Sequence, residues 1–350
     1  MDRVFIAGGG AAGMLCASIL QDGFDVTLAE KKRRYEFIPD ILSLINRDEE
    51  HGDLQRHEEM LPNVSFIHKE VTAVSPGLAV AGKEHEFDYL VLCTGSSLRG
   101  AFDSNTISPY SYDSIHSNLE MIRGSESHLV IGGGPVGVEL MGELMSSDEK
   151  NDVLMVHGGE RILNRMGPKV SEAVMWHYSN RGGRFALSKR VVETWGSKFI
   201  LDDGEEVEAD LAYMSTGFRP VTDYLAGEYA PSLSPSGHVK VNHCLQIQGH
   251  QNAYAVGDIT AIRGEKTYIA AERQAKVAAG NIVRTKEGKT LSSYRPLSLP
   301  MLLSLGSDNA LLACGDHIIK SSLLLRLKRS EGKYVNFKLG HARFSKAMPI

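Results

Sequence analysis

Two glycine-rich turns constrain this chain more than any other feature of its sequence. GGGAAG stands at residues 8–13 and GGGPVG at residues 132–137, and both have the spacing G-x-G-x-x-G. Each turn follows a short apolar run that is typical of a buried parallel strand, and each precedes a helical pattern. A second strand follows each helix, at residues 25–29 and 152–156. This order predicts two βαβ units, each with a dinucleotide-binding turn.

The glycines of the first turn have separate tasks. Gly8 permits the tight turn, Gly10 lets the backbone approach a pyrophosphate, and Gly13 lets the helix pack closely on the strand. The N–H groups at the start of the helix are then available to the phosphates. The glycines expected in the same places of the second turn are Gly132, Gly134 and Gly137.

The residue that ends the second strand of each unit bears on the choice of nucleotide. Glu30 ends it in the first unit and is expected to accept hydrogen bonds from ribose hydroxyls. His157 stands at the corresponding place in the second unit, with Arg161 nearby. Because a carboxylate there repels a 2′-phosphate, its replacement by histidine removes a barrier to NADP. The alternative is that His157 and Arg161 only face solvent.

Two dinucleotide sites in one chain indicate an electron donor and an electron acceptor. Two nicotinamides rarely serve together in this way, so one site is expected to hold a flavin. We expect FAD at the first turn and NAD(P)H at the second, with hydride transfer from the nicotinamide to the flavin. This chemistry depends on positioning the rings, so no catalytic triad is expected. The four cysteines lack metal-ligand spacing, and no metal site is expected either.

Three further segments extend the pattern: FDYLVLCTG at 87–95, YMSTGFRP at 213–220 and YAVGD at 254–258. With the glycine turns, and in this order, they make the chain resemble the two-dinucleotide-binding flavoprotein superfamily. That superfamily includes type II NADH dehydrogenases, apoptosis-inducing-factor-like proteins and sulfide:quinone reductases. The resemblance implies an α/β fold with two Rossmann-like domains of the glutathione-reductase type. It also implies that Asp258 binds the ribityl and pyrophosphate region of FAD.

The last hundred residues look closest to the ferroptosis-suppressor quinone reductases. The segments that carry this similarity are residues 268–271, 278–283, 294–296 and 302–309. The similarity implies an NAD(P)H:quinone oxidoreductase. Two alternatives stay open: a reductase of a small redox protein of the ferredoxin or rubredoxin type, and a redox-signalling flavoprotein like apoptosis-inducing factor. Sulfide chemistry is not expected, because no cysteine occurs between Cys93 and Cys244.

Individual site residues follow from the motifs and the resemblance together. Glu139, on the second turn of its helix, is expected to position the nicotinamide, with a solvated carboxylate as the alternative, and Gln274 is expected on the quinone side. The residues expected to bind FAD are Gly8, Gly10, Ala12, Gly13, Glu30, Lys31, Val71, Thr94, Gly95, Gly257 and Asp258. Of these, Lys31 is equally well interpreted as exposed. The residues expected to bind NAD(P) are Gly132, Gly134, Pro135, Val136, Gly137, Glu139, His157 and Gly217.

The order of the motifs predicts one domain inserted into another. The Gly-Asp pair at 257–258 belongs to the first site but follows the second in the chain. The FAD-binding domain is therefore expected to comprise residues 1–107 and 232–300, and the NAD(P)-binding domain residues 108–231. A hairpin with an Asp-Gly turn is expected over residues 199–207. Residues 301–350 form a small C-terminal segment.

Positive charge is concentrated in this C-terminal segment. Residues 318–350 carry eight Lys/Arg and one Glu, so they hold about +7 and the remainder about −12 of the net charge of −5. Ile319, Leu323 and Leu327 recur at helical spacing. We expect residues 301–350 to dock on an anionic membrane surface and to help form the quinone entrance. The alternative is that the leucines pack inside the protein or form a homodimer interface.

The remaining composition narrows the cellular setting. No apolar run is long enough to span a bilayer, and the N-terminus lacks the pattern of a secretory signal. A cytoplasmic protein with peripheral membrane association is expected. The negative net charge argues against nucleic acid as a partner.

Overall fold

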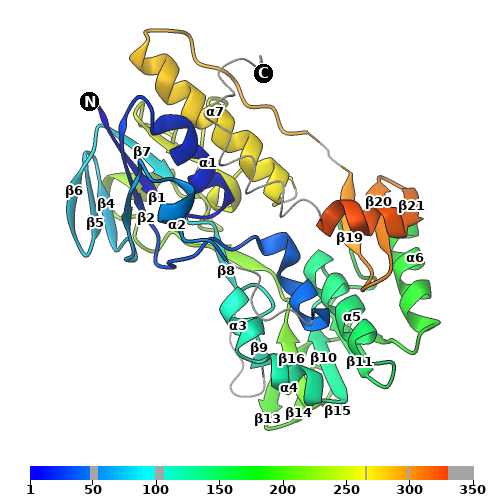
Figure 1. Ribbon diagram of the computed structural model, residues 1–350. Coiled ribbons are helices and arrows are strands. Elements are labelled where there is room, and N and C mark those ends of the chain that lie inside the picture. The colour runs from blue at the N-terminus through cyan, green and yellow to red at the C-terminus, as the bar shows by residue number, and fades with distance from the viewer. Residues whose placement is uncertain (48–53, 99–105, 265, 298–299, 330–350) are drawn as a thin grey trace.

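Two parallel five-stranded sheets organise the chain (Figure 1). The computed structural model describes residues 1–47, 54–98, 106–264, 266–297 and 300–329. Each sheet carries helices on one face and a small antiparallel sheet on the other. The α/β class with two Rossmann-like units, predicted from the sequence, is confirmed.

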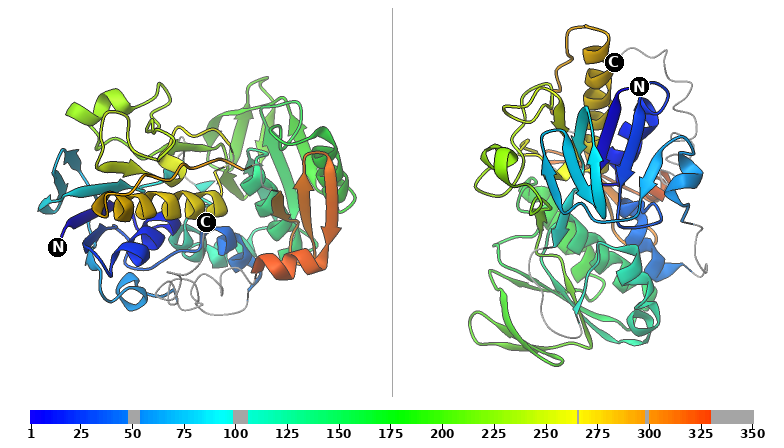
Figure 2. Two further views of the ribbon diagram at one scale, coloured as in Figure 1. Left: turned by 90° about the horizontal axis from the view of Figure 1, so that it is seen from above. Right: turned by 90° about the vertical axis from the view of Figure 1, so that its left-hand side faces the viewer.

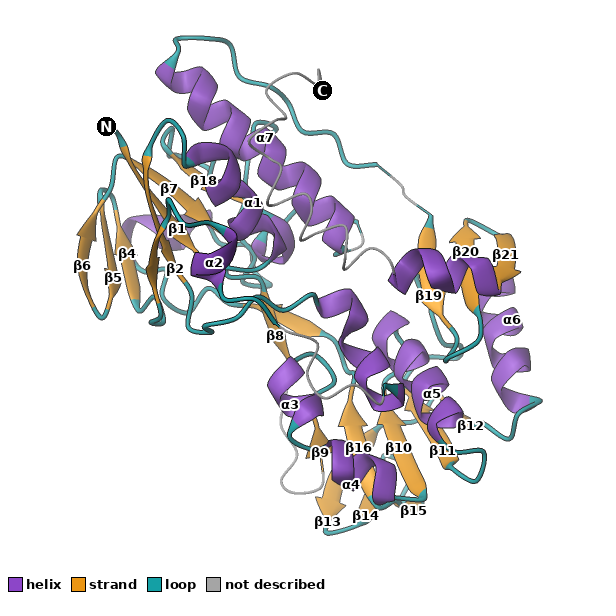
Figure 3. Cartoon of the chain, in the orientation of Figure 1, coloured by secondary structure: helices purple, strands orange, loops and turns teal. Residues whose placement is uncertain are grey.

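The first sheet has the strand order β18-β7-β1-β2-β3, and all its pairs are parallel. Its strands are β1 (Arg3–Ala7), β2 (Asp25–Ala29), β3 (Ser65–Ile67), β7 (Tyr89–Leu92) and β18 (Ala253–Ala255). Helices α1 (Ala11–Leu20) and α7 (Tyr268–Lys286) lie side by side on one face (Figure 3). The other face carries β4 (Ala73–Ser75), β5 (Leu78–Ala81) and β6 (Lys83–Glu86). Strand β1 is buried over residues 4–7, as its apolar sequence requires.

The second sheet repeats this plan with the order β12-β11-β10-β16-β9. Its strands are β9 (Thr106–Ile107), β10 (Ser127–Ile131), β11 (Asp152–His157), β12 (Arg184–Leu187) and β16 (Leu211–Met214). Helices α5 (Pro135–Ser147) and α6 (Pro168–Ser179) cover the sheet on one side. The opposite face carries β13 (Val191–Trp195), β14 (Lys198–Leu201) and β15 (Glu206–Glu208). Strands β14 and β15 form the hairpin predicted over residues 199–207.

The chain passes from the first sheet to the second and then returns. Strands β8 (Ser96–Leu98) and β17 (Phe218–Pro220) pair antiparallel at this double crossing. Strand β18 and helix α7 then complete the first unit after the second unit has been made. Strand β9 lies before the predicted domain boundary at residue 107, yet it pairs with β16 of the second sheet.

Shorter elements complete these two units. They are η1 (Ile38–Asn46), α2 (His57–Met60), α3 (Tyr112–His116), α4 (Leu119–Gly124), η2 (Gly227–Ser232) and η3 (Gly257–Ile259). Of these, η1 belongs to the N-terminal part of the chain but packs against α5 of the second unit.

The C-terminal strands stand beside the second unit (Figure 2). They are β19 (Met301–Ser304), β20 (Ala310–Cys314) and β21 (His317–Ser321), and residues 322–329 are helical. A Cβ on Gly142 of α5 would lie 2.5 Å from the backbone N of Gly306, so only glycine permits this approach. The predicted helical spacing of Ile319 with Leu323 and Leu327 was wrong, because Ile319 is a strand residue that pairs with Leu312.

Candidate cofactor and electron-transfer site

In the first glycine turn, two glycines lie close to neighbouring backbone atoms and a third borders open space. Gly8 has φ +105°, and a Cβ there would lie 2.4 Å from the carbonyl O of Cys93. A Cβ on Gly13 would lie 1.9 Å from the carbonyl O of Gly8. A Cβ on Gly10 would meet nothing within 4 Å. The open space above Gly10, at the N-terminus of α1, therefore fits the pyrophosphate of a dinucleotide. Ala12, one of the residues expected to bind FAD, lies in the first turn of α1 and is buried.

Glu30 is held at the edge of this turn. Its Oε2 accepts a hydrogen bond from the N–H of Gly9 at 2.8 Å, and its Oε1 accepts one from the N–H of Lys32 at 3.0 Å. Lys31 is exposed. His57, which no sequence motif indicated, is also buried here, and its Nε2 lies 3.3 Å from the carbonyl O of Gly9. The four-residue helix that carries His57 gave no sequence signal.

The second glycine turn repeats this geometry. Gly132 has φ +113°, and Cβ atoms on Gly132 and Gly137 would lie 2.3 Å and 2.0 Å from carbonyl oxygens. A Cβ on Gly134 would again meet nothing within 4 Å. Pro135 and Val136 start α5 beside this open space. The second turn therefore offers the same kind of pyrophosphate site as the first.

His157 occupies the position that Glu30 has in the first unit. Its Nδ1 accepts a hydrogen bond from the N–H of Gly133 at 3.1 Å. Burial lowers the pKa of His157, so the neutral form is favoured. The guanidinium of Arg161 donates to the carbonyls of Asn164 and Met166 at 2.8 and 2.9 Å. Arg161 therefore holds its own loop in place.

The two Thr-Gly turns lie at the crossing between the units. Thr94 Oγ1 donates to the carbonyl O of Val221 at 2.7 Å and lies 2.9 Å from the Tyr224 hydroxyl. Gly95 and Gly217 have φ of +66° and +96°, which glycine adopts without strain. Val71 is buried in the core between the first sheet and β4–β6.

Asp258 and Gln274 lie together at the end of β18. The N–H of Gly257 donates to Gln274 Oε1 at 2.7 Å, and Ser96 Oγ donates to Asp258 Oδ2 at 3.1 Å. Burial raises the pKa of Asp258, despite the hydrogen bond from Ser96. A Cβ on Gly257 would lie 3.8 Å from the Cβ of Ala12 on α1. The Gly-Asp pair therefore borders the first glycine turn, as flavin binding requires.

A pocket opens beside these residues. Its walls come from the η3 end, the start of α7 and the chain after α7. They comprise Gly257, Asp258, Ile262, Arg263, Gly264, Lys266, Thr267, Ala270, Ala271, Gln274, Tyr294, Pro296 and Leu297. Lys266 Nζ donates to the carbonyls of Thr260 and Ile262 at 2.7 and 3.2 Å. The pocket thus has a mainly polar lining, with a fixed cation and a carboxylate beside several apolar side chains.

Glu139 of α5 contacts the C-terminal segment at two residues. Glu139 Oε1 accepts a hydrogen bond from the N–H of Ser304 at 3.0 Å and forms an ion pair with Lys328. The side chains of Lys328 and Glu139 are only 11% and 13% exposed. This contact was not expected from the sequence, because the two residues are 189 positions apart. The role of Glu139 in positioning the nicotinamide stays a prediction.

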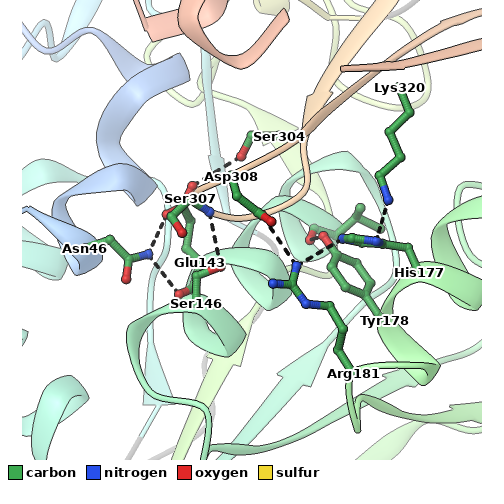
Figure 4. A network of polar contacts seen from close by, with 11 residues as sticks. Asn46, Glu143, Ser146, His177, Tyr178, Arg181, Ser304, Ser307, Asp308 and Lys320 are labelled. Carbon is green, nitrogen blue, oxygen red and sulfur yellow. Dashed lines mark hydrogen bonds and ion pairs between the residues drawn. The ribbon is translucent and has the colours of Figure 1, made fainter. Parts of the chain in front are cut away.

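A second carboxylate on α5 joins three parts of the chain (Figure 4). Asn46 Nδ2 of η1 donates to Glu143 Oε2 at 2.6 Å, and Ser304 Oγ of β19 donates to Glu143 Oε1 at 3.2 Å. Burial raises the pKa of Glu143, while the hydrogen bond from Asn46 opposes that shift. Glu139 and Glu143 therefore tie the N-terminal unit and the C-terminal strands to the helix of the second glycine turn.

Two glycine turns with open pyrophosphate positions, joined by a double crossing, define a flavoprotein that uses a pyridine nucleotide. The chain belongs to the pyridine nucleotide-disulphide oxidoreductase family, whose model matches residues 2–275. It is an oxidoreductase with FAD and NAD(P)H as cofactors. Its four cysteines are unpaired, and three of them are buried.

Known proteins are similar to this chain in sequence or in fold, and only some of them are oxidoreductases by name. Apoptosis-inducing factor homolog B of Dictyostelium discoideum is 24% identical over 95% of this chain and 95% of its own length. Ferroptosis suppressor protein 1 of Xenopus tropicalis is 28% identical over 88% of this chain and 87% of its own. The sulfide:quinone oxidoreductase of Aquifex aeolicus has the same fold, with a TM-score of 0.83 at 21% identity, covering 100% of this chain and 96% of that one.

Proposed function

We propose that this protein transfers electrons from NAD(P)H to a quinone. The observation that carries the proposal is the pocket beside Asp258 and Gln274, next to the first glycine turn. FAD, when bound, accepts a hydride and passes electrons to a second acceptor. An acceptor in this pocket would lie beside the unit that is expected to hold the flavin.

The chemistry of the pocket suits a quinone. Ile262, Ala270 and Ala271 supply apolar walls for a planar ring. Leu297, in the pocket wall, and Ile269, next to Ala270 in the chain, are 59% and 45% exposed, which suits the apolar tail of a lipid-soluble acceptor. The ammonium of Lys266, fixed by two carbonyls, stabilises negative charge that develops on a quinone oxygen. The similarity to ferroptosis suppressor protein 1 supports the same acceptor class.

A lipid-soluble acceptor also calls for contact with a membrane. Among the described residues, no helix is long and apolar enough to cross a bilayer. We propose that the C-terminal segment docks on the surface of an anionic membrane instead. Leu323 and Leu327 follow each other by one helical turn and are 66% and 58% exposed, with the exposed Arg326 between them. Apolar side chains beside a cation are typical of an interfacial helix.

Steady-state turnover with a panel of acceptors tests the quinone proposal. NADH and NADPH are oxidised with quinones of increasing tail length, oxygen, ferricyanide or ferredoxin. We expect Ala270→Phe, which fills the pocket, to lower the rate with quinones while reduction of the flavin by NADPH continues. Ala226→Phe, at an exposed position away from the pocket, is the matched control. Faster turnover with ferredoxin than with any quinone would contradict the proposal and favour a protein acceptor.

A further inference from the structure

The segment after β12 lies against the end of β11. Leu187 pairs with His157 in the parallel register of the two strands. The N–H of Ser188 then donates to the carbonyl O of Gly159 at 2.9 Å, and the N–H of Lys189 donates to that of His157 at 3.1 Å. Residues 188–190 therefore run along the carboxyl edge of the second sheet. Dinucleotides bind at this edge in folds of this type.

Arg190 lies across the loop that follows His157. A Cβ on Gly158 would lie 2.8 Å from Nε and 3.1 Å from Cγ of Arg190, so the side chain rests on this glycine. The backbone of Arg190 is fixed by Asp202, which accepts from its N–H at 3.0 Å and donates to its carbonyl O at 2.9 Å. The side chain itself is exposed. The fold thus holds a guanidinium next to the end of β11.

The neighbouring cations are already engaged. Lys189 forms ion pairs with Asp203, at 2.9 Å, and with Glu205. Arg161 donates to carbonyl groups of its own loop. Within the described part of the chain, no carboxylate pairs with the guanidinium of Arg190. Arg190 is therefore the cation at this edge that can bind an anionic ligand.

Burial favours the neutral form of His157, which differs in charge from Glu30 at the corresponding position of the first unit. Because its Nδ1 accepts from Gly133, the neutral ring carries its hydrogen on Nε2. This nitrogen is buried, and the ring is hydrogen-bonded to the backbone of Arg161. A carboxylate at this position repels a 2′-phosphate. The neutral His157 removes that repulsion, and Arg190 supplies an attraction.

We propose that Arg190 binds the 2′-phosphate of NADPH. The inference rests on the proposed use of NAD(P)H at the second glycine turn and specifies its preferred form. Glu160, in the loop after His157, is exposed and lowers the positive potential there without pairing with Arg190. Arg190 is thus a specificity-determining residue that lies outside the glycine motif and its strand.

Binding of nucleotide fragments tests this proposal without turnover. Calorimetry on the FAD-loaded protein compares adenosine 2′,5′-bisphosphate with adenosine 5′-monophosphate. We expect the bisphosphate to bind about tenfold more tightly or better, which corresponds to roughly 1.4 kcal/mol. Arg190→Ala should remove most of this difference, and Arg190→Lys should retain part of it. Arg184→Ala is the matched control, because Arg184 pairs with Asp152 at the other end of β12.

The outcomes separate this inference from the proposed function. Equal binding of the two fragments to the native protein, or a preference untouched by Arg190→Ala, would overturn the role of Arg190. His157→Glu should reverse the preference, because a carboxylate repels the 2′-phosphate. Reduction of the flavin by NADH is recorded on the same preparations. Absence of quinone turnover with intact discrimination between the fragments would refute the acceptor and leave the phosphate site supported.

Discussion

Replacing glycine by alanine should have opposite consequences for folding at Gly134 and Gly137 of the second glycine turn. Gly134 has φ −77° and ψ 179°, values that alanine adopts without strain, and a Cβ there meets nothing within 4 Å. A Cβ on Gly137 would lie 2.0 Å from the carbonyl O of Gly132. We therefore expect Gly134→Ala to fold normally and lose nucleotide binding, whereas Gly137→Ala should fail to fold or be strongly destabilised.

The size of the binding effect follows from the lost hydrogen bonds. A methyl group on Gly134 occupies the space where the pyrophosphate approaches the N-terminus of α5. Hydrogen bonds to a charged group contribute about 1.5–3 kcal/mol each. Losing two of them costs about 3–6 kcal/mol, or about 10²–10⁴-fold in affinity. At compatible dihedral angles, alanine stabilises the fold by about 0.4–1 kcal/mol relative to glycine.

Anaerobic titration with NADPH measures the affinity, and urea unfolding measures the stability of the same preparations. Gly134→Ala should keep its FAD, and Gly10→Ala should lose FAD instead, because the two open positions belong to different units. Gly23→Ala, also at an open position but after α1, is the control. If Gly134→Ala bound NADPH within about threefold of the native protein, the pyrophosphate would not lie on this turn.

Three further changes test other parts of the structure. Lys328→Met leaves the carboxylate of Glu139 buried without its cation and should lower the free energy of unfolding by about 3–5 kcal/mol. Adding Glu139→Gln to this variant should restore most of the lost stability. If Lys328→Met alone left the free energy of unfolding unchanged, the ion pair would be contradicted. Burial raises the pKa of Glu143 above the ordinary glutamate value of 4.5. Ionising this carboxyl therefore lowers the free energy of unfolding as pH rises above 4.5. Glu143→Gln should therefore exceed the native protein in unfolding free energy at pH 8, with a gap that closes below pH 4.5; a gap that is constant with pH would refute this. Changing Leu323 and Leu327 to Glu should weaken co-sedimentation with anionic vesicles by about tenfold or more, and equal binding would exclude this face.

Much of the fold could be predicted because its signals are local. Each strand, glycine turn and helix lies within about twenty consecutive residues, and the steric demands on Gly8 and Gly13 act inside that stretch. The hairpin of β14 and β15 was predicted from its Asp-Gly turn for the same reason. The relative order of the motifs predicts that one nucleotide unit is inserted into the other.

The contacts that complete the site depend on residues far apart in the chain. Asn46 meets Glu143 across 97 positions, and neither residue belongs to a motif. Arg190 reaches the end of β11 only through the register of β12, which periodicity does not specify. The mistaken helical role of Ile319 has a related cause. A spacing of four residues fits one helical turn, but residues four apart also lie on the same face of a strand.

The net charge of the C-terminal segment does not show which of its basic residues are available to a membrane. Lys328 is paired with Glu139, and Lys320 Nζ lies 2.6 Å from Nδ1 of His177, so both cations serve contacts inside the protein. Of the basic residues within 320–329, Lys320 and Arg326 are exposed, and Lys328 and Arg329 are half-buried. Docking by this described face must then depend on Leu323 and Leu327 more than on charge. Binding to vesicles that persists in high salt would agree with this balance, whereas complete release by salt would assign the attraction to residues 330–350, outside the described part.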